Sequence, residues 1–350
     1  TAYTPYQAEA SQGILQLFYE FQTMVCQLTG MEVANASLYE GATAVAEAVI
    51  MATAITRRQR AVIAESVHPD TLEVLKAYGR ERGIEVVTTS APDGAVDEQA
   101  LGEVLNEATA AVVVQSPNFF GGIERIDRII PDVHACGALA IVAIDPLASG
   151  MLKPPGALGA DIVVGEGQPL GIPLQYGGPY LGLMATREKY LRKMPGRVVG
   201  TAKDRDGRRG FCLALQVREQ HIKRERATSN ICTNQGLLAV RAAVYMAAMG
   251  RRGITQVARQ CFDKAHYAAR EIAKLDGYEL RFEGPFFKEF AVRTARNVQG
   301  VLASCRERGI LAGIPLGRFD ERHNDAFLVA VTEKRTKEEI DDLVAALAEA

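Results

Sequence analysis

Short apolar runs rich in alanine, valine and isoleucine alternate with segments of helical spacing along the first half of the chain. Two of these runs, Ala110–Gln115 and Ala138–Ile144, contain almost no polar residue. Strands that are apolar along their whole length are typical of parallel sheets whose two faces are both covered by helices. Because helical segments separate the runs, the order predicts a doubly wound α/β domain with a parallel-type sheet.

The pattern changes past the middle of the chain, and 350 residues exceed what one typical domain needs. We expect an N-terminal arm and helix over residues 1–30, a large doubly wound α/β domain over residues 31–215, and long helices with a smaller α+β domain over residues 216–350. The chain begins TAYTPYQAEASQG, without an initiator methionine. We therefore expect that further residues precede Thr1.

Composition and charge narrow the kinds of partner that the chain can have. A net charge of −2 indicates neither a nucleic-acid nor an anionic-membrane partner, and no apolar run is long enough to span a bilayer. The cysteines form no CxxC pair, and none has a metal-ligand spacing with a histidine, so we expect no metal site. Scattered cysteines also suit a reducing compartment, and we expect the cytoplasm. The six cysteines are Cys26, Cys136, Cys212, Cys232, Cys261 and Cys305.

Two groups of residues lie where a loop or strand leads into a helical segment and could contact a ligand. Gly41, Ala42 and Thr43 open a helical segment, where free N–H groups and the helix dipole favour a phosphate, although plain capping explains them equally well. His68 follows a predicted strand and could stack on a flat ring. Alternatively, His68 only starts the helix before Pro69.

Asp145 ends the apolar run Ala138–Ile144, at the sheet edge where ligands of open α/β folds bind. A carboxylate there could pair with a protonated ring nitrogen, and a turn or capping acid is the alternative. Together these features resemble the pyridoxal-phosphate fold of the aspartate aminotransferase type (fold type I). The resemblance implies a phosphate site, a ring-stacking residue and an acid under the ring nitrogen. The candidates for these roles are Gly41, Ala42, Thr43, His68 and Asp145.

The same resemblance implies a lysine, further along the chain, that binds the cofactor covalently. No lysine occurs between Lys153 and Lys189, and Lys153 comes too soon after Asp145 to reach the ring. The expected position falls at Glu166 and Gln168, whose side chains could form hydrogen bonds there but no covalent link. We therefore expect no catalytic residue in this chain. A lysine amine beside the predicted acid and the predicted stacking histidine, in an open cleft, would contradict this interpretation.

Four separated stretches resemble one family in particular. They read TAYTPYQAEASQG, NASLYEGATAVAEA, GEGQPLGIPLQYGGPYLG and LQVREQHIKRERATSNICTNQG. The chain is similar to the glycine cleavage system P protein, or glycine decarboxylase. Where that enzyme is split into two chains, the similarity is to subunit 1, the N-terminal half that lacks the cofactor lysine.

This resemblance implies a heterotetramer with two copies of each chain, in which subunit 2 binds pyridoxal 5'-phosphate. The complex would decarboxylate glycine and pass the aminomethyl group to the lipoyl arm of H protein, whereas this chain alone would be inactive. The phosphate, stacking and acid candidates would then be remnants of a lost cofactor site. We also expect the isolated chain to homodimerise or aggregate, because a chain of this family would expose a large apolar dimer face.

Two segments are candidates for reaching into the partner's site. Thr4, Tyr6 and Gln7 precede the first helical segment, and capping or stapling of that helix is the alternative. Asn230 and Asn234 lie among uncharged donors that follow a densely charged run. For this region we expect contacts between subunits rather than docking of H protein.

Two other functions stay open. The chain could be a stand-alone enzyme of the pyridoxal-phosphate fold, aminotransferase-like or lyase-like, that uses another lysine, or it could be a purely structural scaffold subunit. A GxGxxG after the first strand and a GxxxxGKS/T are both absent from the sequence. Dinucleotide and P-loop sites therefore lack support.

Overall fold

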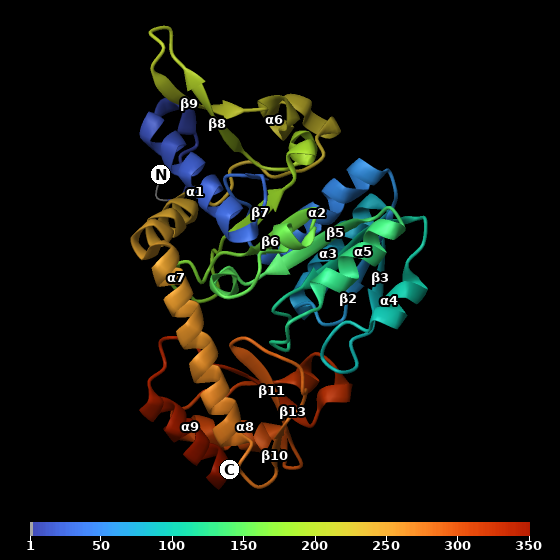
Figure 1. Ribbon diagram of the computed structural model, residues 1–350, viewed down its shortest axis with the longest axis vertical. Coiled ribbons are helices and arrows are strands. Elements are labelled where there is room, and N and C mark those ends of the chain that lie inside the picture. Colours follow the sequence, from blue (N-terminus) through green and yellow to red (C-terminus); the bar gives the residue numbers. More distant parts are fainter. Residues whose placement is uncertain (1–2) are drawn as a thin grey trace.

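The computed structural model, which describes residues 3–350, is built around a seven-stranded sheet with the order β1-β7-β6-β5-β4-β2-β3 (Figure 1). Strands β2 to β6 pair in parallel, which confirms the mainly parallel sheet. β7 pairs antiparallel with β6 and β1, because the loop from β6 to β7 contains no crossover helix. The strands are β1 (Val33–Ala34), β2 (Arg60–Ala64), β3 (Glu85–Thr89), β4 (Thr109–Gln115), β5 (Leu139–Ile144), β6 (Ile162–Glu166) and β7 (Gly182–Thr186).

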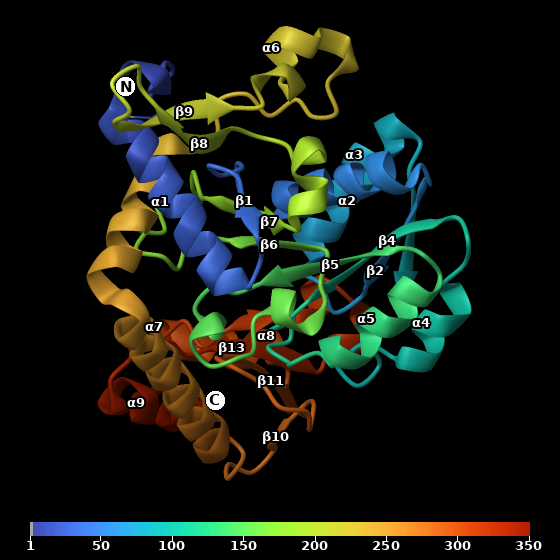
Figure 2. The same ribbon diagram turned by 45° about the horizontal axis from the view of Figure 1, so that its top comes forward.

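Helices cover both faces of this sheet. α2 and α3 lie on one face, and α4 and α5 lie on the other (Figure 2). Every residue of α2 from Ala44 to Thr53 is buried, which explains why small apolar residues fill this helix on all sides. Gly30 and Gly83 end α1 and α3 in the left-handed conformation that C-caps favour. The helices are α1 (Gln12–Thr29), α2 (Gly41–Thr56), α3 (Pro69–Arg82), α4 (Glu98–Val104) and α5 (Ile126–Ala135).

The C-terminal part forms a smaller α+β unit. Its four strands pair antiparallel in the order β10-β11-β13-β12 and share a core with α8 and α9. A hairpin, β8-β9, and the short α6 lie at the opposite end of the molecule in Figure 1. The bounds are β8 (Val198–Lys203), β9 (Arg209–Ala214), α6 (Gln220–Lys223), β10 (Tyr278–Leu280), β11 (Glu289–Thr294), α8 (Val298–Glu307), β12 (Ile314–Pro315), β13 (Ala326–Ala330) and α9 (Lys337–Glu349).

One long helix, α7 (Gly236–Ile272), runs along the side of the molecule from the large sheet to the small one (Figure 1). Gly250, with φ 58° and ψ −178°, interrupts its helical geometry, so α7 is kinked. Its buried side chains up to Cys261 pack in the large core, and those from Ala265 onward pack in the small core. The two hydrophobic cores therefore meet within α7. The predicted domain limits at residues 215 and 216 remain a prediction.

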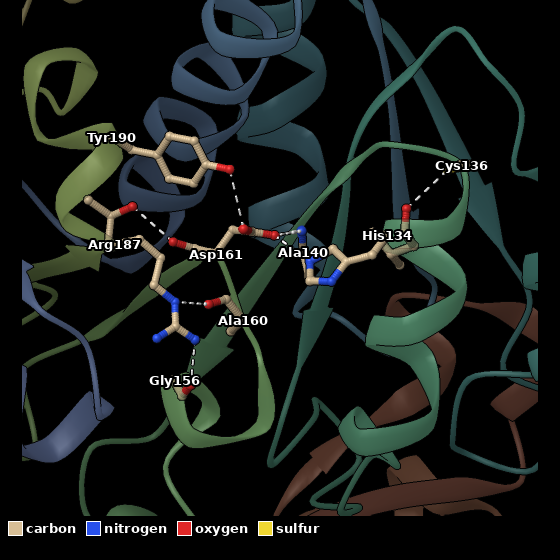
Figure 3. Close-up of polar contacts among 10 residues, drawn as sticks. His134, Cys136, Ala140, Gly156, Ala160, Asp161, Arg187 and Tyr190 are labelled. Atoms are coloured by element: carbon tan, nitrogen blue, oxygen red, sulfur yellow. Dashed lines mark hydrogen bonds and ion pairs between the residues drawn. The ribbon is translucent and has the colours of Figure 1, made fainter.

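A polar network ties α5 to the amino ends of β5 and β6. Asp161 accepts a hydrogen bond from the N–H of Ala140 at 3.0 Å, and the same oxygen lies 2.7 Å from His134 Nε2 (Figure 3). Tyr190 donates to the other oxygen at 3.4 Å. The Asp161 side chain is only 7% exposed, so these contacts satisfy a carboxylate that would otherwise be costly to bury. The network contains none of the predicted site residues, and we assign it to the fold.

Within residues 3–350, no helix combines the length and the hydropathy that crossing a membrane requires. In the same part of the chain, no three His, Cys, Asp or Glu side chains gather closely enough to hold a metal ion. All six cysteines are free thiols.

Candidate functional site

The seven-stranded sheet with its helices is called the large domain below, and the C-terminal α+β unit is called the small domain. A cavity of about 390 Å³ lies where the carboxyl ends of the parallel strands face the small domain. This sheet edge is the place where open α/β folds bind ligands. The large domain lines the cavity with His68, Gln115, Asp145 and Glu166, among others. The small domain contributes Glu289, Leu311, Ala312, Gly313, Ile314, Leu328 and Ala330. The structure thus brings three of the predicted site residues together, although they come from different elements.

His68 both caps a helix and lines the cavity. It is the N-cap of α3, and its Nδ1 accepts a hydrogen bond from the N–H of Asp70 at 3.2 Å. Its own backbone N–H donates to the Gln115 side chain at 3.0 Å, and its ring meets that of Phe119 edge-on, with 5.0 Å between the ring centroids. Burial lowers the pKa of His68, so the ring is neutral near pH 7. The hydrogen bond to Asp70 shows that His68 caps α3, which is one of the two roles that the sequence left open.

Asp145 is held on both of its oxygens. Oδ1 accepts a hydrogen bond from the N–H of Leu147 at 2.9 Å, which forms a turn after β5. Oδ2 forms an ion pair with Nζ of Lys288, which comes from the small domain. The Asp145 and Lys288 side chains are 16% and 12% exposed, so the pair is largely shielded from water. The sequence did not predict this contact, because nothing in the local pattern joins a strand end to a lysine so far along the chain.

A lysine amine thus lies beside Asp145. The sequence interpretation would be contradicted by a lysine amine that lies beside both Asp145 and His68 in an open cleft, so one part of that condition is met. However, Lys288 does not line the cavity that His68 faces, and its amine is held by a carboxylate. Burial alone would lower the pKa of Lys288, but Asp145 and Glu289 outweigh burial and raise it. While it is protonated and paired with Asp145, the Lys288 amine has no free electron pair with which to attack an aldehyde.

Glu166, the last residue of β6, occupies the space at the start of α2. Its Oε2 accepts a hydrogen bond from the N–H of Gly41 at 2.9 Å, and its Oε1 accepts from the N–H groups of Gln168 and Leu181 at 2.8 and 3.1 Å. A Cβ on Gly41 would lie 3.1 Å from the Cβ of Glu166, so the helix start and the strand end are in direct contact. Burial raises the pKa of Glu166, while the three N–H groups favour its charged form.

The rest of the predicted phosphate site is capped by the chain itself. Glu40 is the N-cap of α2 and accepts a hydrogen bond from the N–H of Thr43 at 2.9 Å. The Thr43 hydroxyl lies 3.3 Å from the N–H of Glu40 and completes a capping box. Ala42 stands between them in the first turn. The Gln168 side-chain amide donates a hydrogen bond to the carbonyl of Ile172 at 2.6 Å.

Pyridoxal phosphate does not fit these contacts. A phosphate at the start of α2 would meet the carboxylates of Glu166 and Glu40, which already take the N–H groups of Gly41 and Thr43. A protonated ring nitrogen would have to displace the Lys288 ammonium from Asp145. Like charges would therefore meet at both ends of the cofactor.

The five candidates for a partner's site divide into buried and exposed residues. Thr4 is fully buried, and its hydroxyl donates to a main-chain carbonyl at 3.1 Å. Asn234 is fully buried as well and donates to a carbonyl and a serine hydroxyl at 2.7 and 3.0 Å. Tyr6 is 56% exposed, and Gln7 and Asn230 are also at the surface. The contribution of all five residues to a partner's site remains a prediction, and the three exposed ones can be tested without disturbing the core.

Comparison with known proteins gives a consistent result. The family model for the glycine cleavage system P-protein matches residues 1–347. A probable glycine dehydrogenase (decarboxylating) subunit 1 from Desulfitobacterium hafniense is 51% identical over 349 residues, which cover 100% of this chain and 78% of the relative. The protein of the same description from Prosthecochloris aestuarii is 54% identical over 345 residues, 98% of this chain and 77% of the relative.

The solved structures agree with the sequence comparisons. A crystal structure of glycine decarboxylase (P-protein) of the glycine cleavage system, in inhibitor-bound form, superimposes with a TM-score of 0.94 at 42% identity, over 100% of this chain and 78% of that one. A sphingosine-1-phosphate lyase from Burkholderia pseudomallei has a TM-score of 0.74 at 15% identity, over 99% of this chain and 78% of that one, which shows a shared fold only. The fold is therefore that of the pyridoxal-phosphate-dependent enzymes of fold type I, and the chain belongs to the glycine cleavage system P-protein family.

Proposed function

We propose that this chain is subunit 1 of a split glycine decarboxylase and that it carries no pyridoxal phosphate of its own. The cofactor would be held by subunit 2, in a cytoplasmic heterotetramer with two copies of each chain. The observation that carries the proposal is that no lysine occurs between Lys153 and Lys189, where the resemblance puts the cofactor lysine near Glu166 and Gln168. The lysine that contacts Asp145, Lys288, is ion-paired with it. The names of the relatives, subunit 1, support a second chain.

Within this complex, residues on the surface of this chain would take part in the reaction at the site of subunit 2, and no reaction would take place in the cavity of this chain. Tyr6, Gln7 and Asn230 are exposed and are our candidates for completing the site of subunit 2. Bound there, pyridoxal phosphate would supply the electron sink for glycine decarboxylation. The aminomethyl group would then pass to the lipoyl arm of H protein. Membranes and nucleic acids have no part in this proposal.

Reconstitution tests the proposed function. Glycine–bicarbonate exchange is measured with this chain alone, with subunit 2 alone, and with both, always with H protein and pyridoxal phosphate. We expect no exchange with this chain alone and full exchange only with both chains. Exchange by this chain alone would support a stand-alone enzyme.

A purely structural scaffold without a share in catalysis is the alternative, and the names of the relatives, glycine dehydrogenase (decarboxylating) subunit 1, do not favour it. The two roles differ in the turnover of the assembled complex. If this chain only supports subunit 2, exposed-residue variants that assemble normally will all turn over at the wild-type rate. If it completes the partner's site, some of them will assemble normally and turn over slowly.

A further inference from the structure

Two contacts stand where the fold would place the two charged ends of a cofactor. At one end, the Lys288 ammonium lies on Asp145, the acid expected under a ring nitrogen. At the other end, the Glu166 carboxylate lies on the N–H of Gly41, the first residue of the helix expected to hold a phosphate. Each group therefore has the charge of the cofactor group whose place it takes: positive at the ring nitrogen, and negative at the helix start.

We propose that Lys288 and Glu166 are built-in substitutes for the cofactor, and that together they keep this chain's site closed to pyridoxal phosphate. Lys288 neutralises the acid, and Glu166 satisfies the helix start that a phosphate would otherwise complete. The inference concerns this chain's own cavity, and it rests on the proposed function only in assigning the working cofactor to subunit 2.

The position of Lys288 gives it a second role. It immediately precedes β11 of the small domain, whereas Asp145 follows β5 of the large sheet, so the ion pair joins the two domains beside the cavity. Glu289, the neighbouring carboxylate, also lines the cavity. Without Lys288, Asp145 and Glu289 would be two largely buried carboxylates without a countercharge. Removing one partner of a buried ion pair is far more costly than removing both.

The occupancy of the site is tested with 4'-deoxypyridoxine phosphate, a fluorescent analogue that lacks the aldehyde and cannot bind a lysine covalently. The full chain, alone, is titrated with this probe as wild type and as the double variant Lys288→Met, Glu166→Gln. We expect saturable binding to the double variant that is at least about tenfold tighter than to the wild type. Lys203→Met combined with Glu188→Gln, which neutralises an exposed lysine and an exposed glutamate outside the cavity, should bind as weakly as the wild type.

Wild-type binding as tight as that of the double variant would overturn the proposal, because the site would then already be open. Equally weak binding by a double variant whose circular dichroism and elution volume match the wild type would also overturn it. Both results come from this chain without subunit 2. They therefore stay separate from any failure of the reconstituted exchange reaction.

A thermal double-mutant cycle covers the case in which Lys288→Met does not fold well enough to titrate. Lys288→Met alone should lower Tm by roughly 5 °C or more. Asp145→Asn in the same chain should recover part of that loss, because the acid no longer lacks a countercharge. If the Tm losses of Lys288→Met and Asp145→Asn simply added up in the double variant, the two side chains would act independently. The proposal that Lys288 takes the place of a ring nitrogen on Asp145 would then be refuted.

Discussion

Glu47, in the middle of α2, is a buried acid that the site does not use. It is 2% exposed, and its Oε2 has no hydrogen-bond partner. Burial raises the pKa of Glu47, so its folded form takes up a proton more readily than its unfolded form. A raised carboxyl pKa gives stability that is fully present below about pH 4.3 and is lost as pH rises through the folded-state pKa.

We therefore predict that Glu47→Gln gains stability relative to the wild type as pH increases, by about 1 kcal/mol at pH 8. The free energy of unfolding in urea, measured at pH 5 and pH 8, checks this. Glu107→Gln, an exposed acid, should show no such trend. If Glu47→Gln lost stability equally at both pH values, the buried carboxylate would have to be well satisfied.

Tyr6 is the exposed residue for which a role in the partner's site can be tested most cleanly. Tyr6→Phe removes only the hydroxyl, the polar group that would reach the partner's site, so it should slow glycine–bicarbonate exchange of the assembled complex several-fold. The ring and the backbone stay intact. Analytical ultracentrifugation with subunit 2 should show unchanged assembly. Tyr176→Phe, at a tyrosine that is fully exposed elsewhere, should leave both unchanged. Lost assembly in Tyr6→Phe would mark a structural role instead.

Single site residues could be predicted from the sequence only where their place at the end of a strand puts them at the ligand-binding edge of the sheet. His68, Asp145 and Glu166 each end or follow a strand, and parallel strand ends meet at one edge, so the structure brings them to one cavity. Lys288 could not be found in this way. The sequence shows only a lysine and a glutamate at the start of an apolar strand, and its partner depends on how the small domain packs on the large one.

Among the elements, the turn at Gly121 holds the two domains in contact. Gly121 has φ +87°, and a Cβ there would lie 1.7 Å from the carbonyl oxygen of Glu289, at the start of β11. Gly121→Ala should cost about 3 kcal/mol or more in urea unfolding, because the small domain must shift.

Gly83→Ala is the matched control for this turn. Gly83 ends α3 with φ +66°, but nothing lies within 4 Å of a Cβ there, so this change should cost only about 1 kcal/mol. Equal losses for the two variants would show that backbone strain alone, and not the contact with β11, sets the cost.

Elements with a clear period were predictable, and those set by pairing were not. The apolar runs predicted β4 and β5, and Gly41, Ala42 and Thr43 were predicted to open the helix that the structure shows as α2. The two-residue strands β1 and β12 carry no pattern of their own, because they exist only as partners of β7 and β13. The reversed direction of β7 follows from the missing crossover helix, which a reading of apolar runs alone does not reveal.

For the whole molecule, the surface along α7 predicts how the isolated chain behaves. Leu237 and Val244, seven residues apart on one face of α7, are 46% and 58% exposed. An open groove beside the kink is lined by Met24, Leu28, Met151, Met246 and Ile254, among others. Because such a surface favours association, we predict that the purified chain self-associates without subunit 2. Light scattering after size exclusion measures this, and a monodisperse monomer at micromolar concentration would refute it.

In the assembled enzyme we expect the cofactor to be bound by the partner subunit and not by this chain. Borohydride reduction of the reconstituted, pyridoxal-phosphate-loaded complex fixes the cofactor on the lysine that holds it, and peptide mass spectrometry then locates it. We predict a phosphopyridoxyl group on a lysine of subunit 2 and none on any lysine of this chain. A stoichiometric phosphopyridoxyl group on Lys288, or on any other lysine of this chain, would contradict the account.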